Sequence, residues 1–212
     1  MPAIYAVLTG DLVKSRAIEA GQYDTVLYEL EQLFASQAEA LGLHYSFYRG
    51  DSFQLLLARP EYAVQLALSI RLTLLSLGQD CKISIGIGEV TNLRRDINSA
   101  TGPAFTLSGT GLDNLTGSQR LHIACQQSQL QDIIAVPVRM VDAMLSNLTA
   151  RQAEAVLLHL INPGIAHDAI AKELGTSRAN VTKLLNNSHA DYQLLQVFLE
   201  YCEQHICRSL EP

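Results

Sequence analysis

The 212-residue sequence has no apolar run long enough to cross a membrane. Its most apolar stretch, Ala63 to Leu77, is interrupted by Gln65 and Arg71, whereas a membrane helix needs about 20 predominantly apolar residues. The first residues, Met1 to Tyr5, also lack the positive segment and the apolar stretch of a secretory signal peptide. We therefore expect a cytoplasmic protein that has no membrane partner.

Paired cysteine motifs and an excess of positive charge are also missing. The four cysteines, Cys81, Cys125, Cys202 and Cys207, form no Cys-x-x-Cys pair and have no histidine at zinc-ligand spacing, so we expect buried thiols. The formal net charge is −6, which argues against a protein that coats nucleic acid through a generally basic surface. Any contact with DNA must therefore be local.

What the sequence does contain is enough apolar residues, 48%, to bury a core in one large or two small domains. Its first part alternates between strand-like and helix-like patterns. In chain order we predict a strand from Ala3 to Thr9 that stops at Gly10–Asp11, a helix over Tyr23–Leu41, a hairpin of His44–Tyr48 and Phe53–Leu57, a helix over Pro60–Leu77 and a strand over Lys82–Val90. This βαββαβ order is the ferredoxin-like α+β arrangement, in which the first two strands run parallel and the third lies between them.

Four further segments complete the first domain. We expect a polar loop over Asn92–Thr101, a helix from Gly102–Pro103 to about Leu115, a strand over Gln119–Cys125, and a helix that begins at Ser128 or Pro137 and ends at Ser146. The boundary is placed near Asn147. Residues 1–147 then form the first domain and residues 148–212 the second.

Two carboxylates are expected to meet at one edge of this sheet. Asp11 follows the first strand, and Asp51 lies at the apex of the hairpin. Because the second strand runs parallel to the first, both carboxylates reach the same edge. Mg²⁺ prefers one or two carboxylates and completes its shell with water and phosphate oxygens, so we predict that Asp11 and Asp51 hold Mg²⁺.

Groups that suit phosphates surround this pair in the sequence. Lys14, Ser15 and Arg16 follow Asp11, and Arg49 and Gly50 precede Asp51, which supplies cations and loop N–H groups for a nucleotide or another phosphate ligand. Taken alone, an Asp after Gly is usually a turn residue, and a Lys-Ser-Arg run is usually a solvated loop. The structural interpretation of each motif therefore stays open.

Two of these motifs resemble those of class III nucleotidyl cyclases. Thr9 to Arg16 is similar to their first metal-Asp motif, and Tyr48 to Phe53 is similar to their hairpin and to the Gly-Gly-Asp-Glu-Phe hairpin of diguanylate cyclases. The segment Gly102 to Asp113 is similar to a later cyclase helix. The resemblance implies a nucleotidyl cyclase-like domain in which Asp11 and Asp51 hold the metal and a nucleotide is the ligand.

The sequence departs from the cyclase pattern at that later helix. In the cyclases it presents an Asn and an Arg to the substrate ribose and the transition-state phosphate, whereas Ser108–Leu112 contains neither. Such a cation supplies several kcal/mol of barrier reduction. Arg94, Arg95 and Arg120 are the alternatives that the sequence offers. A cyclase or nucleotidyltransferase, a nucleotide-binding regulator and a structural adaptor all remain open.

The C-terminal part has the spacing of a helix-turn-helix. We predict a first helix from a Thr149 cap to Leu160, a second over Asp168–Gly175, and a third over Arg178–Asn186. The spacing of Ala171, Gly175, Val181 and Leu184 resembles that of sigma-factor region 4 and LuxR-type helix-turn-helix modules. A cyclase-like domain followed by this module resembles the SatD family. The preferred hypothesis is therefore a DNA-binding transcriptional regulator.

The third helix of this module offers the expected DNA contacts: Ser177, Arg178, Asn180, Thr182 and Lys183. From Thr149 onward, five basic residues accompany seven acidic ones, so one module alone would bind DNA weakly. The apolar helix Tyr192–Ile206 could pair two copies and place their recognition helices one DNA turn apart, so we expect a homodimer. The alternative is a trihelical module used for packing or protein contacts.

Overall fold

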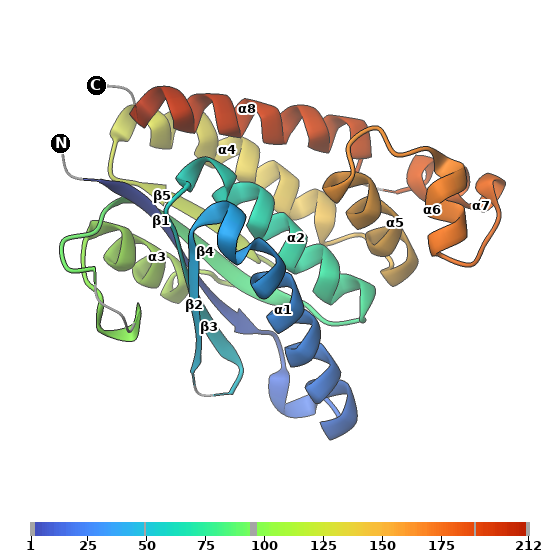
Figure 1. Cartoon of the computed structure of the whole chain (residues 1–212), viewed down its shortest axis with the longest axis horizontal. Coiled ribbons are helices and arrows are strands. Elements are labelled where there is room, and N and C mark those ends of the chain that lie inside the picture. The colour runs from blue at the N-terminus through green and yellow to red at the C-terminus, as the bar shows by residue number, and fades with distance from the viewer. Residues whose placement is uncertain (1–2, 49, 94–96, 189, 211–212) are drawn as a thin grey trace.

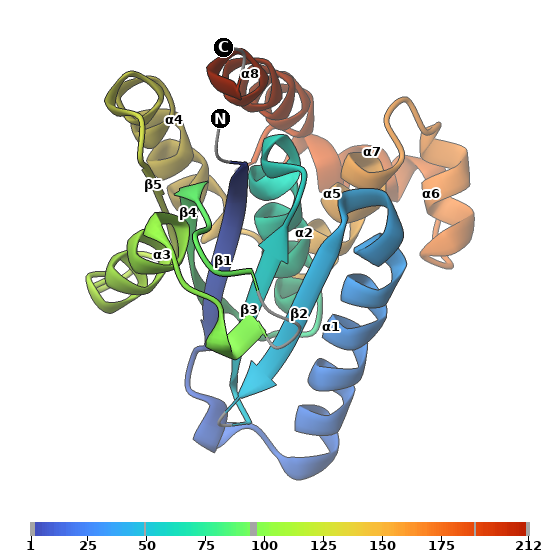
Figure 2. The ribbon, with the colours of Figure 1, turned by 60° about the vertical axis from the view of Figure 1, so that its left-hand side comes forward.

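A five-stranded sheet forms the centre of the protein (Figures 1 and 2). The structure is a computed structural model, and it describes residues 3–48, 50–93, 97–188 and 190–210. The strand order is β2-β3-β1-β4-β5. The strands are β1 (Ile4–Leu12), β2 (Leu43–Tyr48), β3 (Ser52–Leu57), β4 (Cys81–Glu89) and β5 (Leu121–Cys125). β1 is antiparallel to β3 and to β4, β2 is antiparallel to β3, and β4 is parallel to β5. Therefore β1 and β2 run in the same direction with β3 between them.

Helices cover both faces of this sheet (Figure 2). α1 (Ala20–Leu41), α2 (Ala63–Ser76) and α4 (Ser128–Leu145) pack with Leu8, Leu55 and Ile85, whereas α3 (Pro103–Asp113) packs on the opposite face with Val7 and Leu56. Successive residues of a strand point to opposite faces, so the apolar runs of β1 and β3 supply both cores. The protein is a mixed α+β structure. Three short 3₁₀ segments, η1 (Ser15–Ala17), η2 (Pro60–Tyr62) and η3 (Ile97–Ser99), join these elements.

The last four helices continue the larger of these two cores. They are α5 (Ala150–Ile161), α6 (His167–Glu173), α7 (Arg178–Asn186) and α8 (Tyr192–Leu210). α5 packs on α2, while α8 lies along α4 and also meets η2 (Figure 1). Buried residues of α5, such as Val156, and of α8, such as Ile206, belong to the same apolar cluster as the sheet. None of the described helices is both long and apolar enough to cross a membrane.

The C-terminal helices begin where local signals predict them. Thr149 and Gln152 form a capping box in which the Thr149 side chain accepts from the Gln152 N–H and the Gln152 side chain accepts from the Thr149 N–H. The Ser177 side chain accepts from the Asn180 N–H at the start of α7. Gly175, with φ +59°, allows the chain to turn after α6.

Two sequence predictions differ from the structure, and the structure decides a third that had left two helix starts open. β1 does not stop at Gly10–Asp11 but continues to Leu12, because Leu12 is buried and its N–H donates to the Asp51 carbonyl. α4 begins at Ser128 and contains Pro137, because apolar residues on both sides of the proline pack into one core. Cys207 is partly exposed, although Cys81, Cys125 and Cys202 are buried as predicted.

A charged network lies inside the core. Arg71, the residue that interrupts the most apolar stretch of the sequence, is fully buried on α2. Its Nε and Nη2 donate to both oxygens of Asp80 at 3.0 and 2.9 Å, and its Nη1 donates to Asp142 Oδ1 at 2.9 Å. Asp142 also accepts from the Arg120 N–H and from Arg139. The network joins α2 and α4 to the starts of β4 and β5.

Candidate functional site

Asp11 lies at the end of β1, on the sheet face that α3 partly covers. Its neighbours across the strands are Ser52 on β3 and Lys82 on β4. Ser52 Oγ donates to Asp11 Oδ1 at 2.8 Å. Lys82 Nζ instead donates to the Leu115 carbonyl at 2.8 Å. The Asp11 carboxylate is thus oriented by a hydroxyl and not by a cation.

Asp51 belongs to the β2–β3 turn, which is fastened to the end of β1. The Leu12 N–H donates to the Asp51 carbonyl at 3.0 Å, and Ser15 Oγ donates to Asp51 Oδ2 at 2.6 Å. The Tyr23 hydroxyl of α1 donates to the Gly50 carbonyl. The structure therefore brings the segment from Asp11 to Ser15 next to Gly50 and Asp51, which follow it by about 35 residues in the sequence.

Negative charge at this edge has no internal compensation within the described residues. Among the residues that the structure describes, neither Asp11 nor Asp51 forms an ion pair. The second oxygen of each carboxylate, Asp11 Oδ2 and Asp51 Oδ1, accepts no hydrogen bond from these residues. The charge also affects its neighbour: burial, followed by the nearby Asp51 and Asp24 carboxylates, raises the pKa of the Tyr23 phenol.

The two carboxylates fit a hard divalent cation. Each has one oxygen oriented by a serine hydroxyl and a second oxygen available to a ligand. Among the described residues, no group of three or more His, Cys, Asp or Glu could hold a metal ion. Water and ligand oxygens would therefore have to complete the shell, which is the usual situation for Mg²⁺.

The predicted phosphate-binding residues are only partly in place. Lys14 and Arg16 are exposed on the segment after β1, and Lys14 has a left-handed backbone with φ 56°. Lys14 also borders an open cavity of about 520 Å³, together with Asp80, Arg120 and Leu148. Arg49, Arg94 and Arg95 lie outside the described residues.

Sequence reasoning missed a polar row that crosses the whole sheet. Cross-strand pairing aligns one polar residue from each strand: Ser46, Gln54, Thr9, Ser84 and His122. Gln54 Nε2 donates to Thr9 Oγ1 at 3.4 Å, and Ser84 Oγ lies 3.2 Å from His122 Nδ1. Single polar residues within otherwise apolar strands were the available signal. Their alignment depends on strand register, which the sequence does not state.

The helix α3 packs closely on this row. Ser108 forms a hydrogen bond with Thr9, and a Cβ atom placed on Gly111 would lie 2.2 Å from Ser84 Oγ. The segment Ser108–Leu112 thus packs against the sheet through small residues. Arg120 donates to the carbonyls of Gly117 and Gln119 and lies 3.7 Å from Asp80.

The residues predicted to contact DNA lie in different environments. Arg178, Asn180 and Lys183 are exposed on α7. Ser177 caps the helix, and Asn180 Nδ2 donates to Thr176 Oγ1 at 3.0 Å. Thr182 is partly buried, and its Oγ1 lies 2.9 Å from His167 Nδ1. Its side chain joins α7 to α6.

Comparisons with known proteins give structural neighbours only. No protein-family model and no curated protein matches the sequence. The catalytic core of a rhodopsin-guanylyl cyclase, in complex with ATPαS, has 17% identity and a TM-score of 0.46 over 58% of this chain and 78% of that chain. A bacterial light-regulated adenylyl cyclase has 12% identity and a TM-score of 0.45 over 58% and 76%. The guanylate cyclase domain from Catenaria anguillulae, in complex with GTP, has 18% identity and a TM-score of 0.43 over 57% and 78%.

Proposed function

We propose that this protein binds a nucleotide through a Mg²⁺ ion held by Asp11 and Asp51. The observation that carries the proposal is the pair of carboxylates at one sheet edge, each oriented by a serine and neither paired with a described cation. A carboxylate oxygen without an internal cation or donor is available to a divalent ion. The strand order β2-β3-β1-β4, with the Leu12 N–H donating to the Asp51 carbonyl, supports the proposal because it puts the end of β1 beside the β2–β3 turn.

Each nearby group has a defined part in this proposal. Ser15 and Ser52 hold the carboxylates in fixed orientations through their hydroxyls. Lys14 and Arg16 are exposed on the segment that follows Asp11, and the proposal assigns them contacts with phosphate oxygens. A bound Mg²⁺ would neutralise part of the phosphate charge and polarise the phosphoryl oxygens.

Binding is the proposed role, and turnover is the competing one. In a cyclase-like reaction a cation must stabilise charge that develops on the transferred phosphoryl group. Here Ser108 and Gly111 occupy the face of α3 that meets the sheet, and Arg120 is held by Asp80 and two backbone carbonyls. We therefore propose a nucleotide sensor that leaves its ligand unchanged.

Thermal-shift titration tests this proposal. ATP and GTP are each added with Mg²⁺ or with EDTA to the native chain, to Asp11→Asn and Asp51→Asn, and to Asp132→Asn as an exposed control on α4. A ligand at about 100 times its Kd stabilises by about 2.7 kcal/mol, and we expect this only with Mg²⁺ and only in the native and control chains. Chromatography of the incubated nucleotide should show no product. A cyclic or hydrolysed product that depends on Asp51 would favour the enzyme.

DNA binding is the second candidate function. It is favoured by the arrangement of α6 and α7, which are joined by a tight turn at Gly175 and leave Arg178, Asn180 and Lys183 exposed. These are the features of a helix-turn-helix recognition helix, and the chain order resembles that of the SatD family. We propose that a homodimer is needed, because one module has few basic residues to neutralise DNA phosphates.

Selection of genomic DNA fragments tests the second candidate. The full chain should enrich a palindromic site, and Arg178→Ala should abolish that enrichment because an exposed arginine is a principal base contact. Arg208→Ala, at the far end of α8, is the matched control and should leave enrichment unchanged. Enrichment that survives Arg178→Ala, or no enrichment at all, would favour a packing role for these helices.

A further inference from the structure

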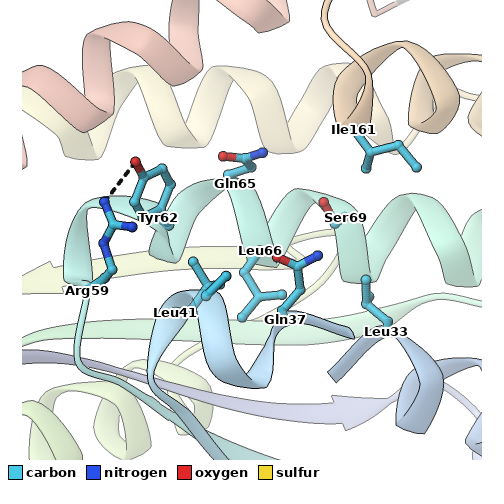
Figure 3. Close-up of a pocket in the computed structure, with 10 residues that line it drawn as sticks. Leu33, Gln37, Leu41, Arg59, Tyr62, Gln65, Leu66, Ser69 and Ile161 are labelled. Carbon is cyan, nitrogen blue, oxygen red and sulfur yellow. Dashed lines mark hydrogen bonds between the residues drawn. The ribbon is translucent and has the colours of Figure 1, made fainter. Parts of the chain in front are cut away.

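A second cleft lies between α1, α2 and the end of α5, away from Asp11 and Asp51 (Figure 3). Its volume is about 290 Å³. Leu33 and Leu41 of α1, Leu66 of α2 and Ile161 of α5 form the apolar part of its lining. This volume is at the lower end of the range for small-molecule pockets, about 300–1,000 Å³, so it suits a ring-sized molecule and not a whole nucleotide.

Three polar side chains face this cleft without internal partners. Ser69 is only 5% exposed, yet its hydroxyl forms no hydrogen bond with any residue that the structure describes. The amides of Gln37 and Gln65 likewise make none within the described ranges, and both border the cleft in Figure 3. The Ser69 hydroxyl is therefore open to the cleft, where a ligand or water can be its hydrogen-bond partner.

The charge of the cleft restricts which class of ligand it can bind. Arg59 is the charged residue in the lining, and its Nε donates to Glu61 at 3.0 Å while its guanidinium lies 4.4 Å from the centre of the Tyr62 ring. Figure 3 shows its second bond, from Nη2 to the Tyr62 hydroxyl at 3.0 Å. Because Arg59 is already paired with Glu61, it offers little to a phosphate or carboxylate. The ligand should therefore be uncharged.

The chemistry of the two amides identifies the ligand more closely. A glutamine side chain presents a donor and an acceptor side by side, and it pairs with a ring edge that carries the complementary acceptor and donor. The leucines and Ile161 supply apolar contact for the flat faces of such a ring. We propose that this cleft binds a small, uncharged, planar heterocycle with an adjacent donor and acceptor, such as a nucleobase or an aromatic carboxamide.

Binding in this cleft would have a structural consequence. Ile161 is the last residue of α5 and immediately precedes the segment that leads to α6. A ligand that contacts both Ile161 and Leu33 would join α5 to α1. Hydrogen exchange should therefore slow at the end of α5 and in the second half of α1 when ligand is bound.

Calorimetric titration of the full chain with adenine, cytosine and nicotinamide tests the proposal. We expect at least one to bind with a Kd below about 1 mM, and its analogue without the exocyclic amino or carboxamide group, purine for adenine or 3-methylpyridine for nicotinamide, to bind at least about tenfold more weakly. Gln65→Leu and Ser69→Ala should each weaken binding by about tenfold, since each removes one hydrogen bond to the ligand.

Two controls make the outcome decisive. Gln204→Leu replaces an exposed glutamine on α8 and should leave the affinity unchanged. Ser69→Ala removes only a hydroxyl, so it keeps the test valid if Gln65→Leu does not fold. The proposal is overturned if no probe binds in a saturable manner, or if binding survives both substitutions. Neither result depends on the Asp11 and Asp51 site.

Discussion

Arg71 shows that the structural role of a residue depends on its environment in the fold. In the sequence it interrupts an apolar stretch, which is typical of a surface position on a helix. In the structure its guanidinium is fully buried between Asp80 and Asp142. Such a cluster is maintained only while all its charges are present, because removing one partner leaves the others desolvated and unpaired.

Replacing Arg71 should therefore be severe. We expect Arg71→Met to lower the free energy of unfolding by about 3–5 kcal/mol, measured by urea denaturation, because the buried Asp142 would lose its buried cation and keep only the half-exposed Arg139. Arg151→Met is the control, since the Arg151–Glu154 pair is exposed and should contribute only about 0–1 kcal/mol. If the two substitutions lowered the free energy of unfolding equally, the buried network would not stabilise the fold more than an exposed ion pair does.

His122 gives the protein a predictable response to pH. Burial lowers the pKa of His122, so the unfolded chain takes up its proton more readily than the folded chain. The contribution of neutral His122 to the free energy of unfolding is therefore complete above the pKa of the unfolded chain, about 6.5. It is lost as the pH falls from there toward the lower pKa of the folded chain. The free energy of unfolding should thus decrease less steeply between about pH 7.5 and pH 5.5 in His122→Gln than in the native chain. The exposed His44→Gln variant should retain the native slope.

The sequence was most informative about the two carboxylates and least informative about cross-strand partners. Asp11 and Asp51 could be placed near each other because strand direction follows from the βαββαβ order. Their roles in metal binding remain a prediction. The Ser52 and Ser15 hydroxyls that orient them depend on strand register and on the path of the segment after β1. The contact between Thr182 and His167 could not be predicted, because helical spacing alone does not show which neighbour a half-buried side chain meets.

At the scale of elements, α3 owes its position to its small residues. Gly111 faces Ser84 and His122, and an added Cβ would come within 2.2 Å of Ser84 Oγ, whereas Gly109 has no other residue's atom within 4 Å of such a Cβ. The two glycines therefore have opposite roles in one helix. The first allows close packing on the sheet, and the second only adds backbone freedom.

The two glycines form a matched pair for mutation. Gly111→Ala should lower the free energy of unfolding by about 1–3 kcal/mol, because the added methyl overfills the contact with β4 and β5. Gly109→Ala should raise it by about 0.5–1 kcal/mol, since alanine costs less backbone entropy in a helix. Urea denaturation of both variants checks the signs. Stabilisation by Gly111→Ala would show that α3 does not lie so close to the sheet.

Element boundaries were predictable where the signal is local. The Thr149 and Ser177 caps mark the starts of α5 and α7 in the sequence and in the structure. Pro137 left two possible starts for α4, Ser128 and Pro137, because a proline inside a helix costs about 3 kcal/mol and favours a helix start. Burial of Ile134 and Val138 on either side of it offsets this cost, and such tertiary packing is not visible in a local pattern.

At the scale of the whole molecule, the apolar core crosses the boundary predicted near Asn147. Leu148, Val156 and Leu160 belong to the same buried cluster as Leu68 and Leu72 of α2. α8 extends this cluster along α4 (Figure 1). The boundary between the two predicted domains was placed near residue 147 because the pattern of the sequence changes there. The packing of α5 on α2 is a contact between distant segments, which sequence spacing cannot supply.

This continuity predicts cooperative unfolding. Scanning calorimetry should give one transition whose calorimetric and van't Hoff enthalpies agree, because the C-terminal helices share their buried residues with α2 and α4. Val156→Ala, which truncates a buried side chain of α5, should shift that single transition to lower temperature. Two separate transitions, of which Val156→Ala lowers only one, would show that the C-terminal helices unfold as an independent unit.

The central claim is that Asp11 and Asp51 bind a nucleotide through Mg²⁺. Its most direct measurement is isothermal titration of the full chain with ATP and with GTP, each in the presence of Mg²⁺ and of EDTA. The account predicts saturable binding of at least one nucleotide with Mg²⁺, no binding in EDTA, and loss of binding in Asp51→Asn while Asp132→Asn binds normally. Equal binding in EDTA and in Asp51→Asn, or no binding of either nucleotide, would contradict it.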